Sequence, residues 1–260
     1  MPREQIMIAT SDGDCSSYVL TPSTVGRWPA VIFYMDAGGI RPAIIQMAER
    51  LAEAGYVVLL PDLYYRFGPY GPLVPEEVFQ GDVMSILGPL MATTGNARAA
   101  ADTGSLLRYL HTRADVVGAT GAVGFCMGGG MALSAAAIYT DRFQAVASFH
   151  GGNLATGAPT SPHLLAAGLK AEVYVAVAEN DEQYPQDMAM RFEQAMIEAG
   201  VRYRSETYWG AAHGWMTTDF PTFNKAASDR GWVELLALFE RTLGASPLSS
   251  KRNSLPKESD

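Results

Sequence analysis

The stretch 124–130, Gly-Phe-Cys-Met-Gly-Gly-Gly, constrains the fold of this chain more than any other. It follows the apolar run 119–123 and opens an apolar segment without proline or charge, so we predict a buried strand that turns directly into a helix. Glycine-x-nucleophile-x-glycine at such a junction is typical of a nucleophile elbow, because side chains two residues either side of the apex would collide as strand and helix pack. Gly124 and Gly128 would remove those collisions and leave Cys126 at the apex.

Cys126 has two interpretations. It can be an inert, buried cysteine in a glycine-rich turn, or it can be a catalytic nucleophile. In the second case the helix N-terminus favours a thiolate, and the N–H of Met127 points at the oxyanion that forms during acyl transfer. We favour the nucleophile, because suitable partners follow later in the chain.

Length and composition set the domain prediction. The chain has 260 residues, of which 48% are apolar. Because α/β folds of this length often form a single domain, we predict one domain over residues 1–244. Residues 245–260 are rich in Ser, Lys and Pro and show no periodicity, so we predict a disordered tail.

Charge and cysteine content limit the partners. The formal net charge of −8, without a long basic cluster, argues against nucleic acid and anionic membranes. No apolar run reaches transmembrane length and the N-terminus lacks a signal peptide pattern, so we expect a soluble, cytoplasmic protein whose partner is a small molecule. Cys15 and Cys126 are too few for a disulfide framework, and without metal-ligand or nucleotide motifs we expect no metal and no cofactor. The oligomeric state stays open between a monomer and a weak dimer.

Strand and helix signals alternate along the chain. The runs 6–9 and 16–20 predict an N-terminal hairpin. Repeated βα units over one core predict an α/β protein with a doubly wound, mostly parallel sheet and helices on both faces. Further strands are predicted at 30–35, 56–60, 119–123, 145–149, 172–178 and 203–208, and helices at 42–54, 98–112, 131–139, 185–199 and 232–243.

Two segments are predicted to be irregular. Residues 151–168 are rich in Gly, Pro and Ser, and residues 61–95 contain five prolines and a dense aromatic group. These aromatic side chains either pack onto the body or wall a substrate pocket, because loops at the carboxyl ends of parallel strands face the ligand crevice. The group consists of Tyr64, Tyr65, Phe67 and Tyr70.

A nucleophile elbow needs a base and an acid, which in this class follow in the order nucleophile, acid, histidine. Of the four histidines, only His213 comes after the late strand predicted to end near residue 178. The end of that strand supplies Asp181, with Glu179 and Glu182 as competitors. We therefore predict a catalytic set of Cys126, Asp181 and His213.

These residues also carry a family resemblance. Three motifs resemble the dienelactone hydrolase (carboxymethylenebutenolidase) family: Gly-Phe-Cys-Met-Gly-Gly at 124–129, Pro-Asp-Leu-Tyr at 61–64 and Ala-His-Gly-Trp at 212–215. The resemblance spans nearly all of residues 5–243. It implies an α/β-hydrolase fold that opens lactones or esters through an acyl-cysteine. It also implies that the N–H of Ala37 is a second oxyanion donor beside Met127.

Two positions depart from the family pattern. The family has a glutamate beside the thiol, and here the matching residue is Asp36, which either keeps Cys126 protonated until substrate arrives or only bonds loop amides. The family's arginine for the substrate carboxylate lies four residues past the histidine, where this chain has Thr217. Tyr64 and Trp215 are further candidates for gating or substrate binding.

The missing arginine bears on the substrate. Without a cation at Thr217, neutral aromatic or short-chain esters fit better than dienelactone, unless Arg66 or Arg98 supplies the charge. The alternative function is therefore a general carboxylesterase or thioesterase. A ligand-binding module without catalysis is a third possibility, against which the intact order of nucleophile, acid and base argues.

Overall fold

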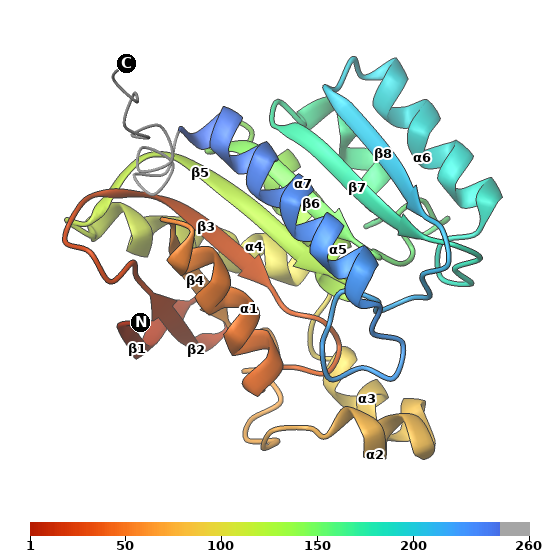
Figure 1. Ribbon diagram of the computed structural model, residues 1–260, viewed down its shortest axis with the longest axis horizontal. Coiled ribbons are helices and arrows are strands. Elements are labelled where there is room, and N and C mark those ends of the chain that lie inside the picture. The colour runs from red at the N-terminus through yellow and green to blue at the C-terminus, as the bar shows by residue number, and fades with distance from the viewer. Residues whose placement is uncertain (245–260) are drawn as a thin grey trace, which may run out of the picture.

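The structure, a computed structural model, describes residues 1–244. The predicted tail at 245–260 lies outside the described residues. Within residues 1–244 the strands form one eight-stranded sheet in the order β1-β2-β4-β3-β5-β6-β7-β8 (Figure 1).

The sheet is mostly parallel, as predicted. The expected hairpin is confirmed, with longer strands: β1 pairs antiparallel with β2, which pairs antiparallel with β4, and all the remaining pairs are parallel. The central strands are apolar because both faces are covered by helices. The strands are β1 (Arg3–Thr10), β2 (Gly13–Leu20), β3 (Trp28–Tyr34), β4 (Val57–Pro61), β5 (Val116–Phe125), β6 (Phe143–Phe149), β7 (Glu172–Ala178) and β8 (Tyr203–Tyr208).

Helices cover both faces of the sheet, as expected for a doubly wound fold. In Figure 1, α1 and α7 lie in front of the sheet and α4 lies behind it, where α4 packs against α5. Helix α7 begins seven residues before its predicted start, because the Asn224 side chain caps it by accepting a hydrogen bond from the N–H of Ala227. The long helices are α1 (Pro42–Glu53), α4 (Asn96–Thr112), α5 (Met127–Ile138), α6 (Gln186–Glu198) and α7 (Lys225–Leu243).

Three short helices lie in the segments that we predicted to be irregular: α2 (Pro75–Gln80), α3 (Val83–Met91) and the 3-10 helix η1 (Pro162–Gly168). Prolines start α2 and η1, where a missing N–H costs nothing. Asp82 caps α3 by accepting from the N–H groups of two residues in its first turn. Figure 1 shows α2 and α3 apart from the sheet, near the carboxyl ends of its central strands.

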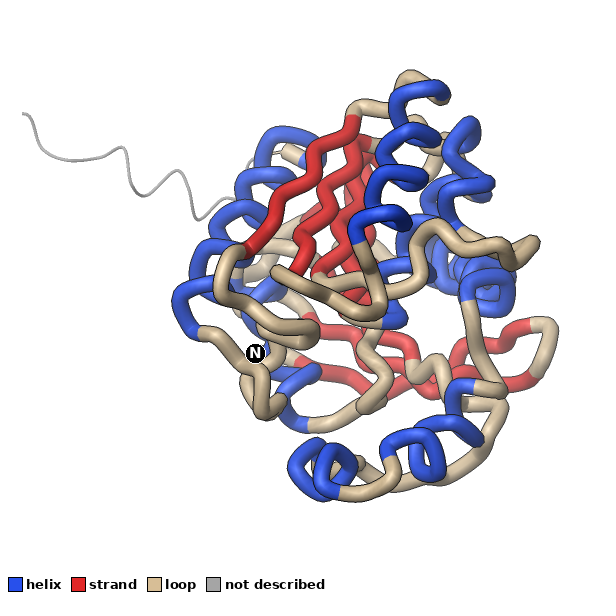
Figure 2. Tube along the Cα trace, turned by 90° about the vertical axis from the view of Figure 1, so that its right-hand side faces the viewer, coloured by secondary structure: helices blue, strands red, loops and turns tan. Residues whose placement is uncertain are grey.

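The parallel pairing of the central strands brings the site loops together in a twisted sheet. Figure 2 shows strands near the two ends of the sheet running in clearly different directions. The parallel strands β3, β5 and β7 nevertheless end at the same edge. The loops that follow these three strands therefore meet at one place.

Strand β5 and helix α5 meet in backbone contact. A Cβ atom built on Gly124 would lie 1.9 Å from the carbonyl oxygen of Gly128, and a Cβ on Gly128 would lie 2.3 Å from the carbonyl oxygen of Tyr34 in β3. Both obstacles are backbone atoms, which cannot move aside as a flexible side chain can. The structure thus supplies the steric reason for both glycines of the elbow.

We expect Gly124→Ala to destabilise the protein by more than the roughly 1–3 kcal/mol of ordinary overpacking, because the added methyl overlaps a backbone oxygen. Thermal and urea unfolding measure the effect. Gly157→Ala is the matched control, since a Cβ at Gly157 meets nothing within 4 Å. Equal stability of the two variants would contradict the steric account.

Candidate active site

Cys126 occupies the turn between β5 and α5. Its backbone has φ 53° and ψ −121°, a strained conformation that costs a non-glycine residue about 1–3 kcal/mol. The turn is held by a hydrogen bond of 3.1 Å from the N–H of Cys126 to the carbonyl oxygen of Phe149 in the neighbouring strand. Cys126 is 8% exposed and lines a cavity, so the turn presents the thiol to that cavity.

The structure brings Cys126, His213 and Asp181 into one hydrogen-bonded row. The Nε2 atom of His213 lies 3.1 Å from the Sγ atom of Cys126, and the Nδ1 atom lies 2.8 Å from Asp181 Oδ2. Because a carboxylate only accepts, Nδ1 donates to Asp181. In the neutral ring this leaves Nε2 free to accept the thiol proton.

The two competing acids lie elsewhere. Glu179 accepts a hydrogen bond of 2.6 Å from the N–H of Gly210, and Glu182 is exposed. Asp181 is buried, and its second oxygen accepts from the N–H of Gln183 at 2.9 Å. Of the three carboxylates that the sequence left in competition, Asp181 is the one in contact with His213.

The surroundings of His213 strengthen it as a base. Burial by itself lowers the pKa of an imidazole, but the hydrogen bonds and negative charges of Asp181 and the Cys126 thiolate outweigh burial and raise the pKa of His213 to about 10. This environment favours transfer of the thiol proton from sulfur to the ring.

The two residues whose N–H groups were predicted as oxyanion donors, Met127 and Ala37, both belong to the cavity lining. Met127 is the first residue of α5, so its N–H has no partner within the helix. Ala37 follows β3, and among residues 1–244 its N–H donates to no protein acceptor. Both residues line the cavity with Cys126. The two amides predicted as oxyanion donors are therefore on the cavity wall.

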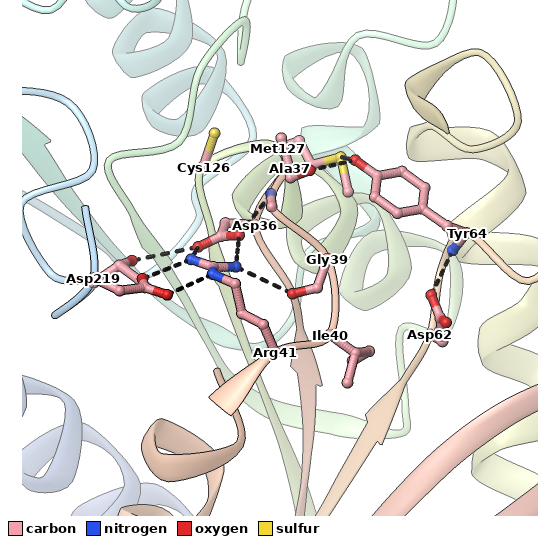
Figure 3. Close-up of polar contacts among 12 residues, drawn as sticks. Asp36, Ala37, Gly39, Ile40, Arg41, Asp62, Tyr64, Cys126, Met127 and Asp219 are labelled. Carbon is pink, nitrogen blue, oxygen red and sulfur yellow. Dashed lines mark hydrogen bonds and ion pairs between the residues drawn. The ribbon is translucent and has the colours of Figure 1, made fainter. Parts of the chain in front are cut away.

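Tyr64 supports these two residues and does not line the cavity. Its hydroxyl donates to the carbonyl oxygen of Ala37 at 2.9 Å and lies 3.5 Å from the Sδ atom of Met127 (Figure 3). Its side chain is fully buried. Tyr64 thus packs onto the body, which is one of the two roles that the sequence left open for the aromatic group.

The other predicted aromatic residues also lie outside the cavity wall. Trp215 is fully buried and stacks on Tyr208 with ring centroids 4.3 Å apart. Tyr65 bonds Asp102 at 2.9 Å, and Phe67 is exposed. The second role left open for the aromatic group, that of a pocket wall, is therefore not seen for these residues, because their side chains find partners within the body or point to solvent.

Asp36 is engaged by an arginine that the sequence analysis missed. Arg41 donates to both Asp36 oxygens, at 2.6 and 2.9 Å, and Thr217 Oγ1 lies 3.4 Å from one of them. In Figure 3 the Cys126 sulfur points away from this pair. The geometry therefore lends no support to the idea that Asp36 gates the thiol.

Arg41 also binds a second carboxylate. It donates to both oxygens of Asp219, at 2.8 and 3.0 Å. Burial alone would lower the pKa of the Arg41 guanidinium, but its bonds to Asp36 and Asp219 outweigh burial and raise that pKa. Arg41 is therefore a permanent buried cation.

His150 is a second neighbour of His213 that the sequence did not single out as a contact. Its backbone φ is 39°, its side chain is buried, and its ring meets the His213 ring edge-on with centroids 5.4 Å apart. Burial first, and then the charge of His213, lower the pKa of His150 well below its ordinary range. A neutral His150 adds no repulsion to a protonated His213.

The cavity beside Cys126 has a volume of about 580 Å³. Among residues 1–244, the lining includes no Lys, Arg, Asp or Glu side chain, and the ionisable side chains on it are Cys126 and His213. Helices α2 and α3 supply much of the apolar wall. Their contribution consists of Pro75, Val78, Phe79, Val83, Met84, Leu87 and Met91.

The arginines considered as substitutes for the family's cation are engaged elsewhere. Arg66 pairs with Asp12 and Asp102, and Arg98 donates to the carbonyl oxygen of Ala92 at 2.7 Å. Neither side chain lines the cavity, and Thr217 is buried behind it.

Residues 1–244 contain no group of three or more His, Cys, Asp or Glu side chains placed to hold a metal ion. In the same part of the chain, no helix has both the length and the apolar character needed to cross a membrane.

Comparison with known proteins finds relatives that match most of this chain. A "Putative carboxymethylenebutenolidase" of Synechocystis sp. is 26% identical over 247 residues, which cover 94% of this chain and 95% of that protein. A "Probable 2-oxo-3-(5-oxofuran-2-ylidene)propanoate lactonase" of Bradyrhizobium sp. is 26% identical over 234 residues, covering 88% and 90%.

A solved structure gives the same fold. The crystal structure titled as a "Putative Dienelactone Hydrolase" from Klebsiella pneumoniae matches with a TM-score of 0.81 at 23% identity, covering 92% of this chain and 98% of that one. The profile of the Dienelactone hydrolase family matches residues 15–243, nearly all of the described chain. This protein has the α/β-hydrolase fold and belongs to the dienelactone hydrolase family.

Proposed function

We propose that this protein is a cysteine hydrolase that cleaves a carboxylic ester or lactone through an acyl-cysteine intermediate on Cys126. The observation that carries the proposal is the row Asp181, His213 and Cys126, with contacts of 2.8 and 3.1 Å, on the wall of an apolar cavity. Membership of the dienelactone hydrolase family supports it, as do relatives named for opening lactone rings.

Acylation begins at the thiol. His213 Nε2 takes the proton from Cys126, and Asp181 stabilises the resulting imidazolium. The sulfur attacks the carbonyl carbon, and the N–H groups of Met127 and Ala37 bind the oxyanion. When the tetrahedral intermediate collapses, the alkoxide leaves with the proton from His213, either as a free alcohol or as the opened end of a lactone ring.

Deacylation uses the same residues. His213 takes a proton from a water molecule, whose oxygen attacks the thioester carbonyl of the acyl-cysteine. The second tetrahedral intermediate expels the Cys126 thiolate, which recovers its proton from His213, and the carboxylic acid leaves.

The cavity favours uncharged acyl groups, which supports the alternative of a carboxylesterase or thioesterase for neutral substrates. A carboxylate moved from water into this cavity loses its hydration, and no lysine or arginine on the wall replaces it. The nearby Arg41 is 1% exposed and already paired with two carboxylates. A lactone or ester with an apolar acyl part meets no such penalty.

We expect Cys126→Ala to lower turnover of a nitrophenyl ester by about a hundredfold or more, because only binding and the oxyanion donors remain. Cys15→Ala is the matched control: burial raises the pKa of the Cys15 thiol to about 12, so this second cysteine is inert. Mass spectrometry of the trapped acyl-enzyme locates the adduct. An adduct on any residue other than Cys126 contradicts the proposal.

We expect wild type to be more stable than His213→Gln at low pH, and we expect this difference in the free energy of unfolding to shrink as the pH rises. The folded-state pKa of His213, about 10, lies above the ordinary 6.5, so its contribution is fully present below pH 6.5 and is lost as pH rises through about 10. Melting temperatures of both proteins between about pH 6 and about pH 10 measure the difference. When both proteins also carry Asp181→Asn, the stability difference should disappear at a lower pH. A stability difference that stays constant or grows between about pH 6 and about pH 10 would count against the raised pKa of His213.

We compare two nitrophenyl esters of equal length, one with a neutral acyl chain and one whose acyl chain ends in a carboxylate. We expect kcat/KM to be about tenfold or more higher for the neutral ester, because the carboxylate lacks one charge-assisted hydrogen bond in the cavity and the free energy of such a bond corresponds to a factor of this size. Met84 lines the cavity and is 64% exposed, so Met84→Lys should place a cation at the mouth and narrow this ratio. Met84→Gln, which adds polarity without charge, is the control. A wild-type preference for the carboxylate ester contradicts the prediction.

A further inference from the structure

The Arg41 guanidinium uses all of its hydrogen-bonding capacity. Its five N–H donors meet five acceptors: two on Asp36, two on Asp219 and the carbonyl oxygen of Gly39 at 3.1 Å. The side chain is 1% exposed. A lysine offers three donors from one point, so it cannot reproduce this planar arrangement.

The two carboxylates belong to the loops that carry Ala37 and His213. Asp36 lies two residues after the end of β3 and directly precedes Ala37, whose N–H is the proposed oxyanion donor. Asp36 Oδ1 also accepts from the N–H of Gly38 at 2.9 Å. Asp219 lies six residues after His213 in the loop that follows β8. Arg41 thus binds one carboxylate close to it in sequence and another 178 residues away, and Figure 3 shows both contacts.

Each end of this connection is stiff. Arg41 is the N-cap residue of α1, followed by Pro42, so its backbone is anchored on a long helix. On the histidine side, Thr217 donates its N–H to Gly214 O at 3.0 Å, and Phe220 donates to Thr217 O at 3.1 Å. A displacement of Asp219 is therefore passed along a short, bonded loop towards His213.

The connection also reaches the cavity wall. The Arg41 guanidinium lies 5.0 Å from the centroid of the Phe220 ring, and Phe220 lines the cavity. Phe220 in turn meets Phe79 of α2 edge-on, with centroids 5.1 Å apart.

The buried pair of Arg41 and Asp36 is a weak way to gain stability, because desolvation offsets most of the attraction, and the bond to the partly exposed Asp219 is screened by solvent. Such a set of ion pairs instead fixes positions, because each bidentate pair sets both the distance and the orientation between the arginine and the carboxylate. Here the geometry that it fixes is the spacing between the oxyanion loop and the histidine loop.

We propose that Arg41 is a positioning residue for the reaction. By binding Asp36 and Asp219 at the same time, Arg41 holds the Ala37 N–H and the His213 ring at a fixed distance and orientation relative to each other. The proposal rests on the proposed function, in which Ala37 stabilises the oxyanion and His213 moves the proton. Arg41 does not itself line the cavity, although its neighbours Phe220 and Gly38 do. Its loss therefore acts on the transition state more than on substrate binding.

The test variants separate the connection from the buried pair. Asp219→Ala removes the partner whose side chain is 32% exposed and leaves the Arg41 and Asp36 pair intact, so it releases the histidine loop without stranding a buried charge. Arg41→Lys is the second variant, and it loses the bidentate geometry while it keeps the charge.

The chain offers a matched control. Arg66 binds the fully buried carboxylate of Asp102 at 2.7 and 2.9 Å and the half-exposed carboxylate of Asp12 by one bond of 2.7 Å. This is a similar arrangement outside the cavity lining, with one bidentate pair and one single bond. Asp12→Ala and Arg66→Lys therefore remove comparable ion-pair contacts, and they leave the loops that carry Ala37 and His213 unchanged.

We expect Asp219→Ala and Arg41→Lys to lower kcat for a neutral nitrophenyl ester by about tenfold, with KM within about twofold of wild type, as a small misplacement of reacting groups does. Binding of a trifluoromethyl ketone with the same acyl group, which forms a tetrahedral adduct on the thiol, should weaken by a similar factor. The two control variants should lose melting temperature to a similar extent while keeping wild-type kcat.

Two results overturn the positioning role: wild-type kcat in Asp219→Ala, or an equal loss of kcat in Asp12→Ala. If either occurs while Cys126→Ala is inactive, the proposed function stands and only the role of Arg41 is wrong. Turnover retained in Cys126→Ala overturns both. If Arg41→Lys fails to fold, Asp219→Ala decides alone, because its buried pair is intact.

Discussion

The contact between the backbones of β5 and α5 is the constraint on which the site depends. Gly124 and Gly128 let a strand and a helix approach until a Cβ atom would overlap a carbonyl oxygen. The one residue between strand and helix then has no extended or helical conformation available, and Cys126 takes a positive φ. The same contact that builds the core thus fixes the direction of the thiol and places the Met127 amide beside it.

Topology supplies the remaining groups. Parallel strands end at one edge of the sheet, so Ala37 after β3, Asp181 after β7 and His213 after β8 reach Cys126 from separate loops. Loops are the least constrained part of such a fold, and their relative positions need further ties. Tyr64 provides one on the oxyanion side, and the ion pairs of Arg41 with Asp36 and Asp219 provide another.

The sequence predicted the features that depend on local pattern. Continuous apolar runs located the buried strands, and the elbow glycines indicated the close approach at Cys126. Prolines misled the analysis in residues 61–95, because Pro75 starts α2 and Pro89 lies inside α3, where we had expected only breaks. Helices this short show too little periodicity to be recognised from sequence.

Contacts between residues far apart in the chain could not be predicted from the sequence. Nothing near Arg41 indicates that its partner Asp219 lies 178 residues away, and the aromatic group around Tyr64 gave no sign of which residue would meet the body and which the solvent. The cavity wall came instead from α2 and α3, whose existence had not been predicted. The motifs were enough to predict that Cys126, His213 and Asp181 come into contact, whereas the surroundings of these residues required the fold.

Four methionines, Met84, Met91, Met127 and Met131, line the cavity. Thioether side chains are unbranched and polarisable, so this wall can change shape around acyl groups of different outline without opening voids. The same atoms are open to oxidation, and each sulfoxide would bring a strong dipole into a wall that has no charge. The methionines that make this wall deformable therefore also make it sensitive to peroxide, independently of the state of the thiol.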